Sequence, residues 1–72
     1  MKIDLHGLTI AEATKIVLEI IDKIRLSRST ETIELVTGQG KMQRKMLDLL
    51  KEYQCEATIR LGNSGIIVAE VE

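Results

Sequence analysis

The chain has 72 residues, of which 44% are hydrophobic and 29% are charged, with no proline and one aromatic residue. This length accommodates one small globular domain, because a second hydrophobic core would need more residues. Ten basic and eleven acidic residues give a net charge of −1, which excludes attraction to nucleic acid by overall charge and leaves only a local basic patch for that purpose.

The first predicted element is a short strand over residues 2–6, where polar and apolar side chains alternate. Successive side chains of a strand point to opposite faces, so Asp4 and His6 share one face and the apolar residues share the other. Gly7 ends the strand. We therefore expect two chemically versatile side chains where this strand runs into a loop.

A helix is predicted to follow, from about residue 10 to residue 25 or 26. Thr9 and Glu12 have the Thr-x-x-Glu spacing of a capping box, in which the two side chains satisfy free backbone donors at the start of a helix. Apolar residues then recur at three- and four-residue spacing, with charged residues on the opposite side. We expect this helix to pack on a sheet and to keep one face in water.

Residues 32–36 are rich in β-branched side chains and predict a second strand. A strand, a helix and a strand in this order predict a right-handed parallel unit. After the loop 37–40, apolar residues recur with helical spacing from Met42 to Tyr53. A second helix is therefore expected to begin just after Gly40.

Two antiparallel strands, residues 57–61 and 66–71, are predicted to close the chain around a glycine-containing turn. The order βαβαββ predicts the α/β class, as a two-layer α/β sandwich with both helices on one face of a mixed four-stranded sheet. Ligands of open α/β sheets bind at the carboxyl ends of parallel strands. Asp4, His6 and the 37–40 loop are therefore expected to converge.

His6 is the residue best suited to acid–base catalysis, because an imidazole with a pKa of about 6.5 accepts and returns a proton near neutral pH. Asp4 could orient that ring, stabilise its charged form or hold a metal ion, although side chains two residues apart in a strand are not assured of a direct hydrogen bond. The alternative is that both residues hydrogen-bond the turn at Gly7 and the adjacent loop.

The segment Thr37-Gly38-Gln39-Gly40 predicts a phosphate-binding loop. Glycines let the backbone approach an oxyanion, and the following helix directs free N–H groups and a positive dipole end toward it. Lys41, Arg44 and Lys45 add positive charge nearby. The alternative is a tight turn between strand and helix that needs glycine for a positive φ.

Arg60 and Asn63 flank the predicted hairpin and are candidate contacts for nucleic acid, with a solvent-exposed turn as the alternative. The methionines of the second helix are expected in the core, and Cys55 is expected to act as a small hydrophobe. Because Tyr53 is the only aromatic residue, stacking on bases is nearly unavailable, and recognition of the backbone and shape of nucleic acid is expected.

Three motifs together resemble the Smr (small MutS-related) domain family. They are Ile3-Asp4-Leu5-His6-Gly7-Leu8-Thr9 with Glu12-Ala13, then Thr37-Gly38-Gln39-Gly40, then Asn63-Ser64-Gly65-Ile66-Ile67-Val68. The resemblance implies a fold similar to the C-terminal domain of translation initiation factor three. It also implies nucleic-acid binding with nicking or endonuclease activity, on RNA at stalled ribosomes in some members and in DNA repair or recombination in others.

The resemblance thus predicts an endonuclease that acts on RNA or DNA, with RNA slightly favoured. Its catalytic residues would be Asp4 and His6. Its phosphate contacts would be Gly7, Thr37, Gly38, Gln39, Gly40, Lys41, Arg44, Lys45, Arg60 and Asn63. The sequence requires no cofactor, and binding of a divalent metal ion by Asp4 is an open alternative. Cleavage of RNA by attack of its own 2′-hydroxyl needs no metal, whereas cleavage by a metal-bound water needs one.

An alternative is a non-catalytic module that docks a larger protein on a ribosome or a DNA junction. It is favoured by the net charge of −1, by Thr37 where many relatives have His, and by the segment 41–45. Relatives commonly carry there a small or hydroxyl residue followed by Leu-Arg or His-Ser. A third interpretation is a protein-interaction domain that uses the open sheet face.

The remaining features concern location and context. No apolar stretch approaches the ~20 residues that span a bilayer, and no charged-then-apolar leader precedes the first strand. A lone Cys55 cannot form an internal disulfide, which fits a reducing compartment. We expect a cytoplasmic domain over residues 1–72 without membrane contact, and it could be the terminal module of a larger protein.

Overall fold

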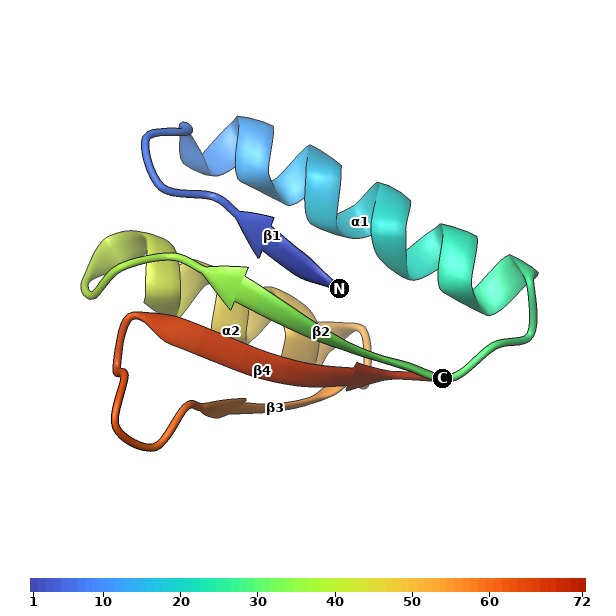
Figure 1. The fold of residues 1–72 in the computed structure, drawn as a ribbon. Helices are drawn as coiled ribbons and strands as arrows, with labels where there is room; N and C mark the ends of the chain where they lie inside the picture. Colours follow the sequence, from blue (N-terminus) through green and yellow to red (C-terminus); the bar gives the residue numbers. More distant parts are fainter.

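The computed structural model describes all residues from 1 to 72 and contains six elements (Figure 1). They are β1 (Lys2–Asp4), α1 (Ile10–Leu26), β2 (Glu31–Val36), α2 (Lys41–Glu52), β3 (Glu56–Ile59) and β4 (Ile66–Val71). The strands form one sheet in the order β1-β2-β4-β3. The β1–β2 pair is parallel and the other two pairs are antiparallel, so the predicted mixed four-stranded sheet is confirmed.

Both outer strands are shorter than predicted. β1 ends at Asp4 and not at residue 6, although the Leu5 N–H still donates to the Val36 carbonyl at 2.9 Å. β3 ends at Ile59, after which the Arg60 N–H donates to the Ile66 carbonyl at 2.9 Å. The first difference matters for the site, because it moves His6 out of the strand and into the following loop.

Both helices begin where the sequence predicts. At α1 the Glu12 N–H donates to Thr9 Oγ1 at 3.1 Å, and the Thr9 N–H donates to Glu12 Oε1 at 2.9 Å. This capping box lowers the pKa of Glu12, because the Thr9 backbone and hydroxyl both stabilise its charged form. α2 begins at Lys41, directly after Gly40.

A single core lies between the two helices and one face of the sheet. Alternate residues of β2 and β4 are fully buried, and buried residues of α1 and α2 pack against them. Residues of β2 that point the other way, such as Thr32 and Glu34, are exposed or half-buried. The arrangement is the two-layer sandwich that the element order predicts, with one sheet face open. No helix of the structure is long and apolar enough to cross a membrane.

Candidate nucleic-acid interface

Three loops meet at one end of the sheet. In the parallel ladder Asp4 pairs with Val36, so the loops that follow β1 and β2 start side by side. The third loop is the hairpin turn between β3 and β4. It joins the 37–40 loop because the N–H groups of Thr37 and Gly38 both donate to the Gly65 carbonyl, each at 3.0 Å. The hairpin turn is thus part of the same surface.

The Asp4 carboxylate holds the turn that carries His6. Its Oδ1 accepts a hydrogen bond from the His6 backbone N–H at 2.9 Å. The carboxylate therefore has the turn-forming role, and it does not contact the ring. The His6 side chain is exposed and has no hydrogen-bond partner within the chain. Its imidazole is free to meet a ligand at the end of the sheet.

The residues around Asp4 do not form a metal centre by themselves. No group of three or more His, Cys, Asp or Glu side chains lies close enough to hold a metal ion. Asp4 is exposed, and one of its oxygens already accepts from the His6 N–H. A hard cation such as Mg²⁺ bound here would need most of its oxygen ligands from water and substrate phosphates.

The 37–40 loop owes its shape to its glycines. Gly38 has a φ of 69° and Gly40 a φ of 108°, and a Cβ at either position would meet no atom within 4 Å. The backbone conformation, and not lack of space, therefore favours glycine. Thr37 is only 5% exposed, and its hydroxyl donates to the Gly38 carbonyl at 2.8 Å. Its side chain supports the loop from inside, and a contact of Thr37 with phosphate stays a prediction.

The N-terminus of α2 differs from that of α1. Gly40 has no side chain to cap the helix, and the first turn of α2 contains no acidic residue. The first N–H groups of a helix have no partner within it, so at α2 they point to the surface of the loop. Lys41, Arg44 and Lys45 are exposed on the first two turns. We call these three residues the basic cluster.

Two glutamines join the hairpin turn to this loop, Gln39, which was predicted as a phosphate contact, and Gln43, which was not predicted to have any role. The Gln39 side-chain amide donates to Ser64 Oγ, and the Gln43 side-chain amide donates to the Ser64 carbonyl. Gln43 is buried, as are Met46 and Leu50 three and seven residues later. That helical spacing is the signal that could have placed Gln43 on the buried face.

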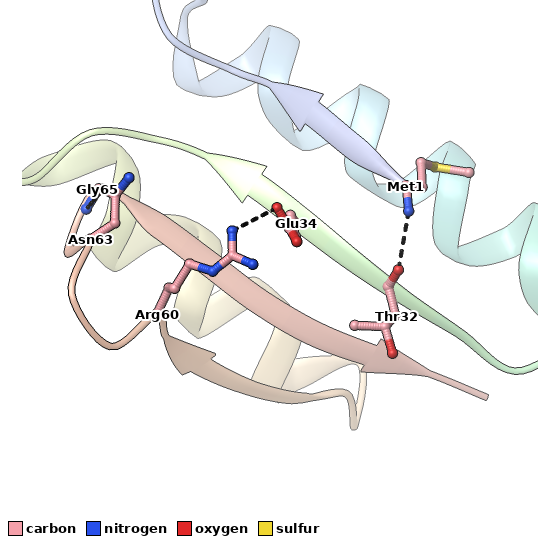
Figure 2. Close-up of polar contacts among 6 residues, drawn as sticks. All are labelled: Met1, Thr32, Glu34, Arg60, Asn63 and Gly65. Atoms are coloured by element: carbon pink, nitrogen blue, oxygen red, sulfur yellow. Dashed lines mark hydrogen bonds and ion pairs between the residues drawn. The ribbon is translucent and has the colours of Figure 1, made fainter.

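Arg60 and Asn63 both have partners within the chain (Figure 2). The Arg60 guanidinium lies 3.0 Å from the Glu34 carboxylate, across β4 on the open sheet face. Asn63 Oδ1 accepts from the Gly65 N–H at 3.2 Å and so shapes the hairpin turn. The structure directs the Arg60 side chain toward β2 and away from the 37–40 loop, and its role as a nucleic-acid contact stays a prediction.

The pocket of the molecule lies away from the three loops. It has a volume of about 260 Å³. It lies between the end of α1 and the start of β2, and its lining consists of Met1, Ile20, Lys23, Ile24, Ser27, Ser29 and Glu31. The candidate interface is instead an exposed surface, which suits a long polymer better than a small enclosed ligand.

Comparison with known proteins gives one family and one solved structure. The family model described as the Smr domain matches residues 3–72. The crystal structure of the Smr domain of Thermus thermophilus MutS2 is similar to this chain, with a TM-score of 0.81 and 23% identity over 99% of this chain and 96% of that chain. At this identity the likeness concerns the fold alone. No curated protein matches the chain.

Proposed function

Because the chain belongs to the Smr domain family, which is related to nucleases and nucleic-acid binding, we propose that it binds a nucleic-acid backbone at the carboxyl ends of β1 and β2. The observation that carries the proposal is the start of α2. It is uncapped, lacks an acidic residue in its first turn and is flanked by the basic cluster. An exposed imidazole stands on the neighbouring loop.

Phosphate is the ligand that this arrangement favours. The aligned peptide dipoles of a helix place about half a positive charge at its N-terminus, where free N–H groups bind an anion. The basic cluster repels that positive end when no anion is bound, and a phosphate group relieves the repulsion. Sequence readout by stacking is weak because the chain has one aromatic residue, so recognition rests on the backbone.

His6 lies on the loop after β1, beside the loop that precedes α2, and it is the group that would supply acid–base chemistry to a phosphodiester bound there. In RNA, the imidazole takes the proton of a 2′-hydroxyl, the 2′-oxygen attacks phosphorus, and the 5′-oxygen leaves with a proton from water to give a 2′,3′-cyclic phosphate. The N–H groups of Gln39 and Gly40, with Lys41, stabilise the negative charge that develops on the phosphate, because the Gly38 N–H already donates to the Gly65 carbonyl. Asp4 acts as a positioning residue, because it holds the turn from which the ring projects.

A second candidate is a docking module without catalysis. In this module Asp4 only shapes the loop, since its carboxylate bonds a backbone N–H and leaves the ring without an orienting partner. A ribosome or a DNA junction would be its target. We also propose that the fold is similar to the C-terminal domain of translation initiation factor three. A role in DNA repair or ribosome quality control and a cytoplasmic location are further parts of this proposal.

Cleavage of end-labelled stem-loop RNA and of supercoiled plasmid, each with and without EDTA, distinguishes the two candidates. We expect His6→Ala to bind as the wild type does but to lose cleavage, and Lys51→Ala, at the far end of α2, to keep both. If the wild type cleaves the nucleic acid and His6→Ala cleaves it equally well, the catalytic role of His6 is contradicted. If the wild type and every variant bind the nucleic acid tightly but none cleaves it, the docking module is established. If replacing the basic cluster leaves binding of the nucleic acid unchanged, the proposed site is refuted.

A further inference from the structure

All the buried polar side chains of the chain lie at one junction. They are Thr37, which is 5% exposed, and Gln43, which is 9% exposed, and both lie where the 37–40 loop meets the hairpin turn. No buried side-chain nitrogen or oxygen lacks a hydrogen-bond partner. An apolar side chain fills a core without this requirement, whereas a buried amide is favourable only in the geometry that satisfies it. The two residues therefore specify one arrangement of the junction.

Gln43 occupies the same position in α2 that Glu12 occupies in α1, the third residue of the helix. Glu12 reaches back and accepts a hydrogen bond from the N–H before its own helix. Gln43 instead reaches sideways, and its amide donates to the Ser64 carbonyl. The start of α2 is thus tied to the hairpin turn, while its free N–H groups keep no side-chain acceptor.

The junction has further links besides Gln43. The Gln39 amide donates to Ser64 Oγ, and two backbone N–H groups of the loop donate to the Gly65 carbonyl. A Cβ at Gly65 would lie 3.4 Å from the Cα of Gly38, so the two backbones are in close contact. Two links of the junction are made by buried side chains, where water competes least. They are the Gln43 bond and a longer bond, at 3.5 Å, from the Thr37 hydroxyl to the Gly65 carbonyl.

We propose that Gln43 is a positioning residue of the phosphate site. Its bond to the Ser64 carbonyl holds the turn 62–65 against the loop 37–40. The Thr37 and Gly38 N–H groups stay bonded to the turn, and the N–H groups of Gln39, Gly40 and the first turn of α2 keep the direction in which they meet a phosphate. The inference rests on the proposed function. The Gln43 side chain does not touch the ligand, because it is buried and its amide donates to the turn.

The test replaces the amide while it keeps the size of the side chain. Gln43→Met removes the donor, and Gln54→Met makes the same change at an exposed glutamine beyond α2. Three quantities are measured: affinity for stem-loop RNA, hydrogen exchange of the Thr37 and Gly38 amides, and the melting temperature. We expect Gln43→Met to stay folded, to bind RNA about tenfold more weakly and to lose protection at both amides. Gln54→Met should match the wild type.

A second variant separates positioning from packing. In Gln43→Glu the ionised carboxylate cannot donate to the Ser64 carbonyl, but the protonated carboxyl can. The chemical shift of the Gly38 amide should therefore return toward the wild-type value as the pH falls, and a shift that does not respond to pH would overturn the inference. This variant also decides the question if Gln43→Met fails to fold.

The failures of the two proposals differ in outcome. Wild-type protein that binds neither RNA nor inorganic phosphate refutes the proposed function and with it the functional role of Gln43. Wild-type binding that Gln43→Met leaves unchanged refutes the positioning role alone. Unchanged protection of the Thr37 and Gly38 amides in Gln43→Met refutes it as well, because the loop would then hold its shape without the bond.

Discussion

Lys41→Glu should stabilise the domain while it abolishes phosphate binding. Lys41 is the first residue of α2, is exposed, and lies at a helix start that has no cap and no acidic side chain. A cation there is repelled by the positive end of the helix dipole, and an anion is attracted. The wild-type Lys41 is therefore unfavourable for folding, and we expect that it serves to bind the phosphate ligand.

The size of the effect follows from the position of the charge. One charge at an exposed helix end contributes about 0.3–1 kcal/mol, and the substitution both removes a cation and adds an anion. A new carboxylate four residues before Lys45 adds a pair worth about 0.2–0.5 kcal/mol. We expect a gain of about 1 kcal/mol, which for a domain of this size raises the melting temperature by about 4–8 °C.

Thermal unfolding followed by circular dichroism, with and without phosphate, measures both parts of this prediction. A ligand at about 100 times its Kd stabilises the folded state by about 2.7 kcal/mol, so phosphate should raise the melting temperature of the wild type past that of Lys41→Glu. Lys51 lies in the last turn of the same helix, where the dipole favours a cation. Lys51→Glu should therefore lower the melting temperature and leave the phosphate response intact.

Two results would contradict this role of Lys41. A melting temperature of Lys41→Glu at or below that of the wild type without phosphate would mean that the start of α2 is not electrostatically strained. An undiminished rise of its melting temperature with phosphate would mean that the anion binds elsewhere. Both measurements should be made at low salt, because added ions screen charges at the surface.

Three further predictions concern salt, pH and thiol reactivity. The slope of log affinity for RNA against log salt concentration should become less negative by about 2 when the three residues of the basic cluster are replaced with alanine, at ~0.7 per phosphate contact. Alanine at Lys15, Lys23 and Arg28 should leave this slope unchanged. The lowered pKa of Glu12 means that its contribution to stability is present above about pH 4.3 and is lost as the pH falls through the folded-state pKa, so Glu12→Gln should show a flatter acid-unfolding profile, and an unchanged profile would contradict the role of the capping box. Burial raises the pKa of the Cys55 thiol more than the charge of a nearby arginine lowers it, so a thiol reagent should modify Cys55 only as fast as the protein opens, and fast labelling of the native protein would count against this.

Features that depend on neighbouring residues could be predicted from the sequence. The capping box of Thr9 and Glu12 acts within one helical turn, and the start of α2 follows from Gly40 and the apolar spacing after it. The order of the elements then limits how the sheet is assembled, since a strand–helix–strand unit pairs its strands in parallel with one handedness. The convergence of the loops after β1 and β2 follows from that pairing.

The polar contacts at the site depend on residues far apart in the chain. Arg60, one residue beyond β3, pairs with Glu34 of β2 across the strand β4 that lies between β3 and β2. Gln43 meets Ser64 because the hairpin turn lies against the start of α2. Even the contact of Asp4 with the His6 backbone required the strand to end two residues earlier than its alternation predicts.

The sequence by itself therefore determined which segments become helices and strands, and which end of the sheet gathers its glycines and basic residues, because these follow from local periodicity and turn chemistry. Only the tertiary structure decided which polar side chains remain free for a ligand. His6 and the basic cluster stay available, whereas Thr37, Gln43 and Arg60 are used within the fold. The reason is that a hydrogen bond or ion pair depends on distances of a few ångströms between segments whose separation the sequence pattern leaves open.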